Sequence, residues 1–138
     1  MIARSFAAPT GVRASTPTHR AAWGRTLSAQ AVVQRQLEAY NARDLQRFLA
    51  EYSEDIRVFR PPAALPTIVG KKAFSEFYAT QRFNHAGLHA ELVNRLVLGN
   101  KVIDHERISG VQEQPFDVAV VYEVRDDLIV CTWAYAAQ

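Results

Sequence analysis

Two carboxylic acids, Asp104 and Glu106, occupy alternate positions in the segment 102–108, between the apolar residues Val102 and Ile108. In a β-strand, side chains alternate between the two faces, so these acids would share one face with Val102 and Ile108. A carboxyl group held among apolar side chains has a raised pKa, because burial disfavours its charged form. Such a group can take up and return a proton near neutral pH, which makes this pair a candidate for general acid/base catalysis.

A turn just before this segment predicts how the two acids are paired. Gly99–Asn100 is typical of a two-residue hairpin turn, which would place Arg95 opposite Asp104 and Val93 opposite Glu106. The arginine is expected to keep Asp104 ionised and structural. Glu106 has an apolar partner instead, so it is the stronger candidate of the two catalytic carboxylates.

The same segment allows an interpretation that needs no substrate. Charges on a strand at a sheet edge or a dimer surface form cross-strand pairs in solvent. A shift of the strand register by one residue would turn Asp104 and Glu106 outward, and the site would disappear. The sequence alone leaves both interpretations open.

Other reactive residue types predict no second site. His89 and His105 fall on opposite faces of the expected strands, and the acids lack metal-ligand spacing, so neither a metal nor a cofactor is expected. The predicted register puts His89 and Glu91 on the same face as the two candidate acids. Cys131 lies among apolar residues and is expected to be a buried, inert thiol.

The elements that would position these acids begin with three predicted helices. Ser28 is typical of an N-cap, and the apolar spacing of residues 29–40 is that of one helix face. Asp44 is expected to begin a second short helix with Tyr52 on its buried face. A third helix is expected over residues 71–83.

From residue 88 onward the apolar period changes from 3.6 to 2, which predicts strands. Including one short strand before the third helix, the expected strands cover residues 56–60, 88–98, 101–108, 116–124 and 128–135. Helices followed by a run of antiparallel strands indicate an α+β fold, with the helices packed on one face of a curved sheet.

Composition narrows the classes of partner. The 138 residues are one domain's worth, and residues 1–27 are expected to form a flexible leader rich in Arg, Ser and Ala ahead of the domain 28–138. Without the four arginines of residues 1–28, 12 basic residues face 14 acidic ones, so no nucleic-acid partner is expected. No apolar run reaches the ~18–20 residues of a membrane span, and one cysteine cannot form an intrachain disulfide. We therefore expect a cytoplasmic protein with no membrane partner.

The element order α-α-β-α-β-β-β-β, with the stretches YNARDL (40–45) and IVGK (68–71), resembles the nuclear transport factor 2-like superfamily. Within it, residues 28–136 are similar to ketosteroid isomerases and SnoaL-like polyketide cyclases. The resemblance implies a cone-shaped, cystatin-like half-barrel, in which three N-terminal helices and a curved, mostly antiparallel sheet enclose an apolar pocket. It also implies that Asp104 and Glu106 point into that pocket.

The resemblance does not preserve the catalytic groups of the ketosteroid isomerases. Their oxyanion-hole tyrosine falls on Gln36, their general-base aspartate on Arg60 and their protonated aspartic acid on Val120. Arginine cannot accept a proton at neutral pH and valine offers no donor, so that mechanism is not expected. The pocket itself is expected to remain, and its implied ligand-binding residues are Gln36, Tyr40, Tyr52, Arg60, Phe77, Tyr78, Val120 and Tyr122.

These observations predict a protein that binds a small, partly apolar molecule in the pocket. Glu106 and Asp104 would supply isomerase, cyclase or dehydratase chemistry without a cofactor, and Arg60 would hold a carboxylate or an enolate-like oxygen. The alternative is a non-catalytic, dimeric ligand-sensing or interaction module, whose pocket would be small or filled by Tyr and Phe side chains.

The expected outer face of the sheet is apolar, and a solvated face would not be. A two-fold dimer that packs sheet on sheet, as the resemblance also implies, would cover it. The residues expected on this face are Leu92, Leu96, Leu98, Ile103, Trp133 and Tyr135.

Overall fold

The structure is a computed structural model, and it describes residues 27–137. The predicted leader lies outside the described residues, apart from its last residue, Leu27. The backbone N–H of Leu27 donates to Asp127 Oδ1 at 3.0 Å, next to the turn between the last two strands.

The three helices are α2 (Ala29–Asn41), α3 (Leu45–Leu49) and α4 (Lys71–Gln81). Both predicted N-caps are confirmed: Ser28 Oγ accepts from the Ala31 N–H, and Asp44 Oδ1 from the Arg47 N–H, each at 3.1 Å. These caps satisfy N–H groups in the first turns, which have no partner inside the helix.

The second helix is shorter than predicted. It ends at Leu49, and Tyr52 is the first residue of a strand and not the last turn of the helix. The backbone explains the difference, since the Glu51 carbonyl accepts from the Ile129 N–H at 2.9 Å and Tyr52 pairs with Ile129. Pairing with the last strand therefore occupies the backbone carbonyl of Glu51, which another helical turn would have used as an acceptor.

Six strands form one sheet, in the order β2-β1-β6-β5-β4-β3. All neighbours are antiparallel except β1 and β6, which are parallel. The strands are β1 (Tyr52–Phe59), β2 (Ile68–Val69), β3 (His89–Leu98), β4 (Lys101–Ser109), β5 (Phe116–Arg125) and β6 (Leu128–Ala136). The short strand β2 was not predicted, because two residues are too few to show the alternation of apolar and polar residues that is typical of a strand.

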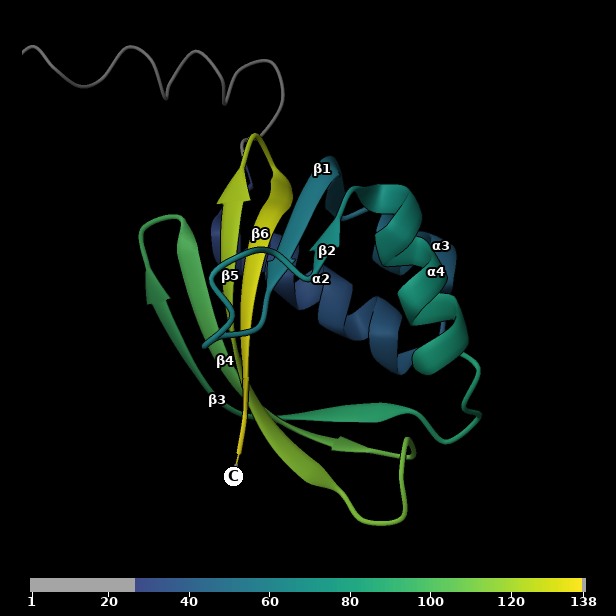
Figure 1. Cartoon of the computed structure of the whole chain (residues 1–138). Helices are drawn as coiled ribbons and strands as arrows, with labels where there is room; N and C mark the ends of the chain where they lie inside the picture. Colours follow the sequence, from purple (N-terminus) through teal and green to yellow (C-terminus); the bar gives the residue numbers. More distant parts are fainter. Residues whose placement is uncertain (1–26, 138) are drawn as a thin grey trace, which may run out of the picture.

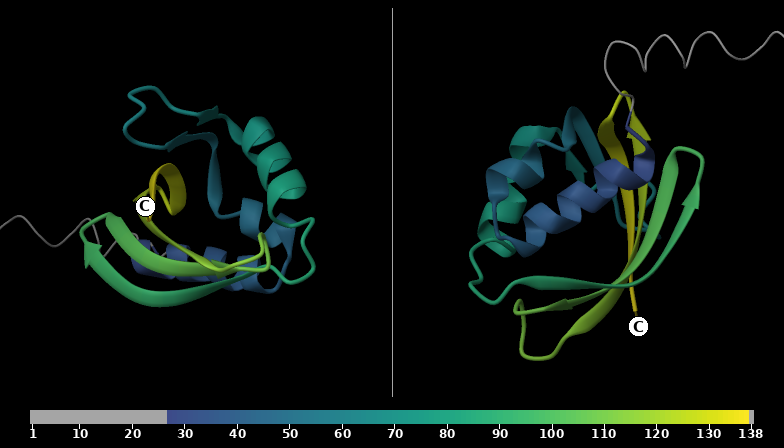
Figure 2. Two further views of the ribbon diagram at one scale, coloured as in Figure 1. Left: turned by 60° about the horizontal axis from the view of Figure 1, so that its bottom comes forward. Right: turned by 180° about the vertical axis from the view of Figure 1, so that it is seen from behind.

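The long strands bend, and the helices lie on the inner side of the curved, open sheet (Figures 1 and 2). The core fills the space between them, with Phe48, Ile56, Phe74, Leu88 and Ile129 almost fully buried. This arrangement confirms the α+β fold with three helices packed on a curved, mostly antiparallel sheet.

A β-bulge in β3 changes the predicted register. The turn at Gly99, whose φ of 60° favours glycine, does pair Arg95 with Asp104 as expected. The register then shifts between Leu92 and Asn94, so Glu106 lies opposite Leu92 and the predicted Val93 partner is wrong.

The same bulge overturns the predicted placement of His89 and Glu91. Both side chains are exposed, and Ala90 between them is buried. One extra residue in the strand reverses the alternation of faces, so residues before the bulge point opposite to the expected side.

The outer face of the sheet carries a row of apolar side chains, which we call the outer stripe. Cross-strand pairing joins its members in turn across five strands: Leu96, Ile103, Val121, Trp133 and Phe59. Phe59 and Trp133 stack with their ring centroids 5.6 Å apart. Leu96 and Leu98 are 57% and 69% exposed, so this end of the stripe is uncovered in the single chain.

One residue predicted for the outer face, Leu92, lies elsewhere, whereas Tyr135 shares that face with Trp133. The bulge turns Leu92 inward, where it packs against the core. Tyr135, close to the end of β6, is half-exposed and borders the cavity described below.

Candidate functional site

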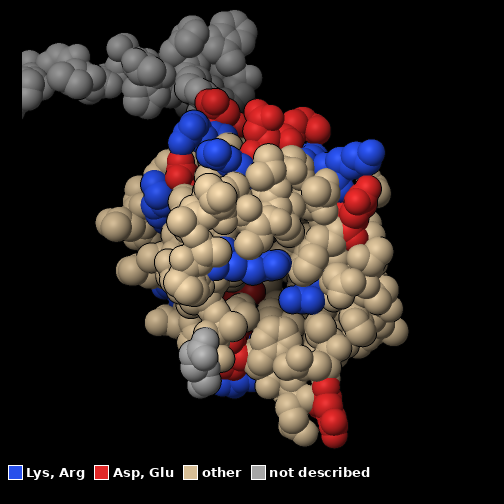
Figure 3. All heavy atoms as spheres, viewed as in Figure 1, with Lys and Arg blue, Asp and Glu red and all other residues tan. Residues whose placement is uncertain are grey.

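A cavity of about 730 Å³ lies between the helices and the inner face of the sheet. Its volume falls within the range of about 300–1,000 Å³ that is typical of small-molecule sites. In Figure 3 the molecule is hollowed on the side shown, with basic groups beside the hollow and acidic atoms inside it. The cavity is therefore open to a ligand from solvent.

Most of the predicted site residues come together here. The cavity is lined by eight predicted ligand-binding residues and by one of the two predicted catalytic acids: Gln36, Tyr40, Tyr52, Arg60, Phe77, Tyr78, Val120, Tyr122 and Glu106. They come from α2, α4, the three strands β1, β4 and β5, and the residue that follows β1.

Asp104 is the exception, and its predicted place in the pocket wall is wrong. Its carboxylate is fully buried and forms a two-point ion pair with Arg95, Nε to Oδ1 at 2.7 Å and Nη2 to Oδ2 at 2.9 Å. The third guanidinium nitrogen donates to Gln34 Oε1 of α2 at 2.8 Å. Arg95, which is itself held by Gln34, therefore engages this carboxylate away from the cavity, where it cannot touch a ligand.

Glu106 has the environment that the sequence predicted for a catalytic acid or base. It is 5% exposed, and its cross-strand neighbours are Leu92 and Val118. Burial is the largest cause that raises the pKa of Glu106 to about 7; the negative charge of Asp104 adds to it, and Tyr122 and Arg95 act in the opposite direction. At neutral pH this carboxyl group is populated in both protonation states.

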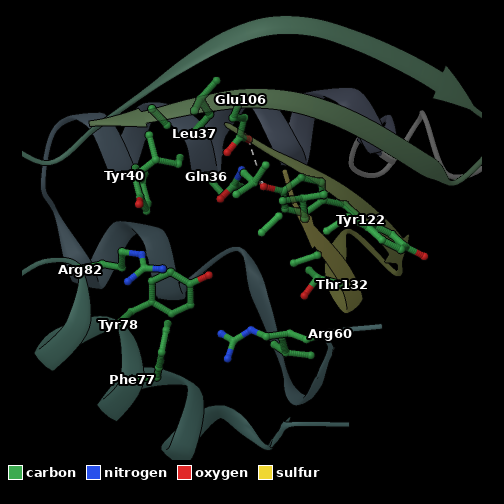
Figure 4. Close-up of a pocket in the computed structure, with 18 of the residues that line it drawn as sticks. Gln36, Leu37, Tyr40, Arg60, Phe77, Tyr78, Arg82, Glu106, Tyr122 and Thr132 are labelled. Atoms are coloured by element: carbon green, nitrogen blue, oxygen red, sulfur yellow. Dashed lines mark hydrogen bonds between the residues drawn. The ribbon is translucent and has the colours of Figure 1, made fainter. Parts of the chain in front are cut away.

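A chain of hydrogen bonds leads to Glu106 across the cavity (Figure 4). The Tyr52 hydroxyl donates to Gln36 Oε1 at 3.0 Å, and Gln36 Nε2 donates to the Tyr122 hydroxyl at 3.3 Å. The Tyr122 hydroxyl donates in turn to Glu106 Oε2 at 3.3 Å. The chain fixes the orientation of one carboxylate oxygen and leaves the other one without a described partner.

The mouth of the cavity has a basic residue that the sequence analysis missed. Arg82, directly after α4, lines the cavity together with Arg60, and both guanidinium groups lie over the ring of Phe77. The sequence spacing could have indicated Arg82, because it follows Tyr78 by four residues and therefore lies on the same face of the helix. Thr132 was missed too, and it pairs with Tyr122 in the sheet.

The family model for the SnoaL-like domain matches residues 33–132. The chain belongs to the SnoaL-like domain family. Among curated proteins, none matches the sequence.

Solved structures share the fold of this SnoaL-like domain at low identity. A candidate ketosteroid isomerase from Kribbella flavida is 17% identical, with a TM-score of 0.70 over 80% of this chain and 78% of that one. A cystatin-fold protein from Novosphingobium aromaticivorans is 20% identical, with a TM-score of 0.71 over 79% and 98%. An LEH-like epoxide hydrolase from M. tuberculosis is 19% identical, with a TM-score of 0.66 over 79% and 82%. These similarities show a common fold, and the reaction has to be inferred from the residues of the site.

The described part of this SnoaL-like domain contains neither a membrane-spanning helix nor a metal-ligand cluster. Within residues 27–137, no helix is both long and apolar enough to cross a membrane. In the same part of the chain, no three His, Cys, Asp or Glu side chains are grouped so that they could hold a metal ion.

Proposed function

We propose that this SnoaL-like protein binds a small, partly apolar molecule in the cavity and catalyses proton transfer next to a carbonyl group. Glu106 is the acid/base residue: it takes the proton from carbon and returns it to the same or a neighbouring atom. The observation that carries the proposal is one buried carboxyl group, placed in the wall of a ligand-sized cavity and with a pKa of about 7.

The surroundings of Glu106 support this role. A base works best when its pKa lies close to the working pH, since both the accepting and the donating form are then present. The Tyr122 hydroxyl holds the carboxyl group in one orientation. Asp104 has a positioning role, since its charge helps to raise the pKa of Glu106 without contacting the ligand.

Hydrogen–deuterium exchange at carbon tests the proposal without requiring the natural substrate. The protein is incubated in D₂O with a panel of small enones, hydroxy acids and aromatic ketones, and deuterium next to the carbonyl group is measured by mass spectrometry. We expect exchange with at least one member, and a loss of about 100-fold or more in E106Q. The rate should rise with pH around the pKa of Glu106, about 7.

The matched control is E91Q, which removes an exposed carboxylate from the neighbouring strand. This variant should exchange at the wild-type rate. Absence of exchange across the whole panel, or equal rates in E106Q and E91Q, would contradict the proposal.

The alternative function, a non-catalytic ligand-sensing module, predicted a cavity that is small or filled by aromatic side chains. The volume of about 730 Å³ does not support that expectation. The exchange experiment separates the two functions, because a sensing module would bind ligands without promoting exchange.

We also propose that the protein is a homodimer through the outer stripe. The stripe is apolar across five strands and uncovered at the Leu96 end, which a monomer would expose to water. A two-fold axis would pack the outer stripe of one chain against the outer stripe of a second chain, so that each stripe would cover the other.

A further inference from the structure

Two arginines stand at the mouth of the cavity without an acidic partner. The guanidinium carbon of Arg60 lies 4.9 Å from the Phe77 ring centroid, and that of Arg82 lies 5.3 Å from it. Among residues 27–137, neither forms an ion pair with a carboxylate. Arg82 Nη1 donates to the Gln81 carbonyl at 2.8 Å, and the Arg82 guanidinium also interacts with the Tyr40 hydroxyl.

The two cations come from distant parts of the chain and meet at one place. Arg60 directly follows β1 and Arg82 directly follows α4, and Figure 4 shows their guanidinium groups on either side of Tyr78, at the same end of the cavity. The shared aromatic ring holds them in position by cation–π contact. Like charges brought together in this way repel each other, and an anion between them would remove that cost.

The chemistry of the mouth fits a carboxylate. Guanidinium groups present forked N–H donors that match the two oxygens of a carboxylate. Burial raises the pKa of the neighbouring Tyr78, although Arg82 and Arg60 oppose the rise, so its hydroxyl remains a neutral donor. An anion in this place would meet two charged donors and one phenol.

The acid/base residue lies at a separate pole of the same cavity. Figure 4 shows Glu106 on the sheet side of the cavity and Arg60 and Arg82 at its other end, with Tyr40 and Tyr78 near the arginines. The wall between the two poles includes apolar side chains of three strands: Val58, Ile108, Phe116, Val118 and Val120. A ligand that fills the cavity is therefore charged at one end and apolar along its body.

We propose that the pocket takes an organic monocarboxylate, with its carboxylate held between Arg60 and Arg82 and its apolar body directed toward Glu106. This inference rests on the proposed function for the use of the far end, where the reacting group would lie beside Glu106. The carboxylate subsite itself is independent of that chemistry, and it can be tested by binding alone.

Matched acid and amide probes test the subsite. Phenylacetate, phenylbutyrate and phenylhexanoate are titrated into the protein by calorimetry, each beside its primary amide, which has nearly the same shape and no charge. We expect at least one acid to bind roughly tenfold or more tightly than its amide, the size of a charge-assisted hydrogen bond. If no acid in the series binds more tightly than its amide, the inference is overturned.

Variants assign the preference to the two arginines. In R60Q/R82Q the acid and the amide should bind within about twofold of each other, while the amide keeps its wild-type affinity. The control is R57Q, which removes an exposed arginine that lies 6.0 Å from the ring of Phe59, in the outer stripe. A preference that survives in R60Q/R82Q, or is equally lost in R57Q, would overturn the inference.

The variant E106Q separates this inference from the proposed function. It should keep the preference for the acid while it loses carbon exchange. A wild-type protein that prefers the acid but shows no exchange would contradict the catalytic function and leave the subsite standing. Exchange at carbon without any preference for the acid would overturn the carboxylate subsite and leave the catalytic function standing.

Discussion

At the scale of single residues, the protonation of Glu106 depends on what surrounds it in the fold. The strongest contribution is burial between Leu92 and Val118, which disfavours the carboxylate form. The charge of Asp104 adds to it, while the Tyr122 hydroxyl and Arg95 favour ionisation.

This raised pKa makes the stability of the protein depend on pH. The folded chain holds the Glu106 proton more tightly than the unfolded chain, so ionisation of this group favours unfolding. Its contribution is fully present below pH 4.5, and it is lost as the pH rises from 4.5 to about 7. At about 1.4 kcal/mol for each pKa unit, the loss is on the order of 3 kcal/mol.

We expect E106Q, which cannot ionise, to be free of this loss. The difference in the free energy of unfolding between E106Q and wild type should shift in favour of the variant by about 3 kcal/mol between pH 4.5 and pH 8.5. Urea denaturation at the two pH values measures it, with E91Q as the control whose difference from wild type stays constant. A constant difference for E106Q as well would show that this group has an ordinary pKa.

At the scale of secondary-structure elements, the bulge in β3 decides which side chains face the cavity. The sequence contains its signal: the apolar residues Leu88, Ala90 and Leu92 occupy even positions, whereas Arg95 pairs with the buried Asp104 from an odd one. A change of phase inside one strand needs one extra residue. The hairpin turn predicted the register correctly up to the bulge and incorrectly beyond it.

The side chain of Asn41 anchors this strand to the end of α2. Its Nδ2 donates to the Ala90 carbonyl at 2.9 Å, and its Oδ1 accepts from the Ala90 N–H at 2.7 Å. The amide therefore takes both backbone groups of a buried residue two positions before the register shift.

We expect N41A to lower the free energy of unfolding by about 1–3 kcal/mol, because the backbone groups of Ala90 lose their partners. Urea denaturation gives the value, and hydrogen exchange of the Ala90 amide should become faster. The control is N94A, which truncates an exposed asparagine in the same strand. Equal stabilities of N41A and N94A would show that the anchor contributes nothing.

At the scale of the whole molecule, the sheet has two faces with different tasks. The inner face holds the cavity and Glu106, and the outer face holds the outer stripe. In the proposed dimer, the cavities would lie on the far sides of the interface, so ligand entry and association would not compete.

The dimer predicts a specific effect of one charge. Leu96 is 57% exposed in the single chain, so L96E should leave the monomer folded. In a two-fold interface the variant would bury two unpaired carboxylates, and we expect the dissociation constant of the dimer to rise by about 100-fold or more. Sedimentation over a range of concentrations measures it.

The control for this experiment is L65E, because Leu65 is 78% exposed and lies in the segment between β1 and β2. It should associate as wild type does. A wild-type chain that stays monomeric at every concentration, or equal association of L96E and L65E, would contradict the dimer.

Local patterns in the sequence determined the helix caps, the hairpin turn, the fold class and the pairing of Arg95 with Asp104, because each depends on residues that are close in the chain. The depth of Glu106 in the wall, the removal of Asp104 from the cavity and the meeting of Arg60 with Arg82 were decided by the tertiary structure. These features depend on the bulge in β3 and on the packing of α2 and α4 against the sheet. Contacts between residues that are distant in the chain produce no hydrophobic periodicity from which they could be predicted.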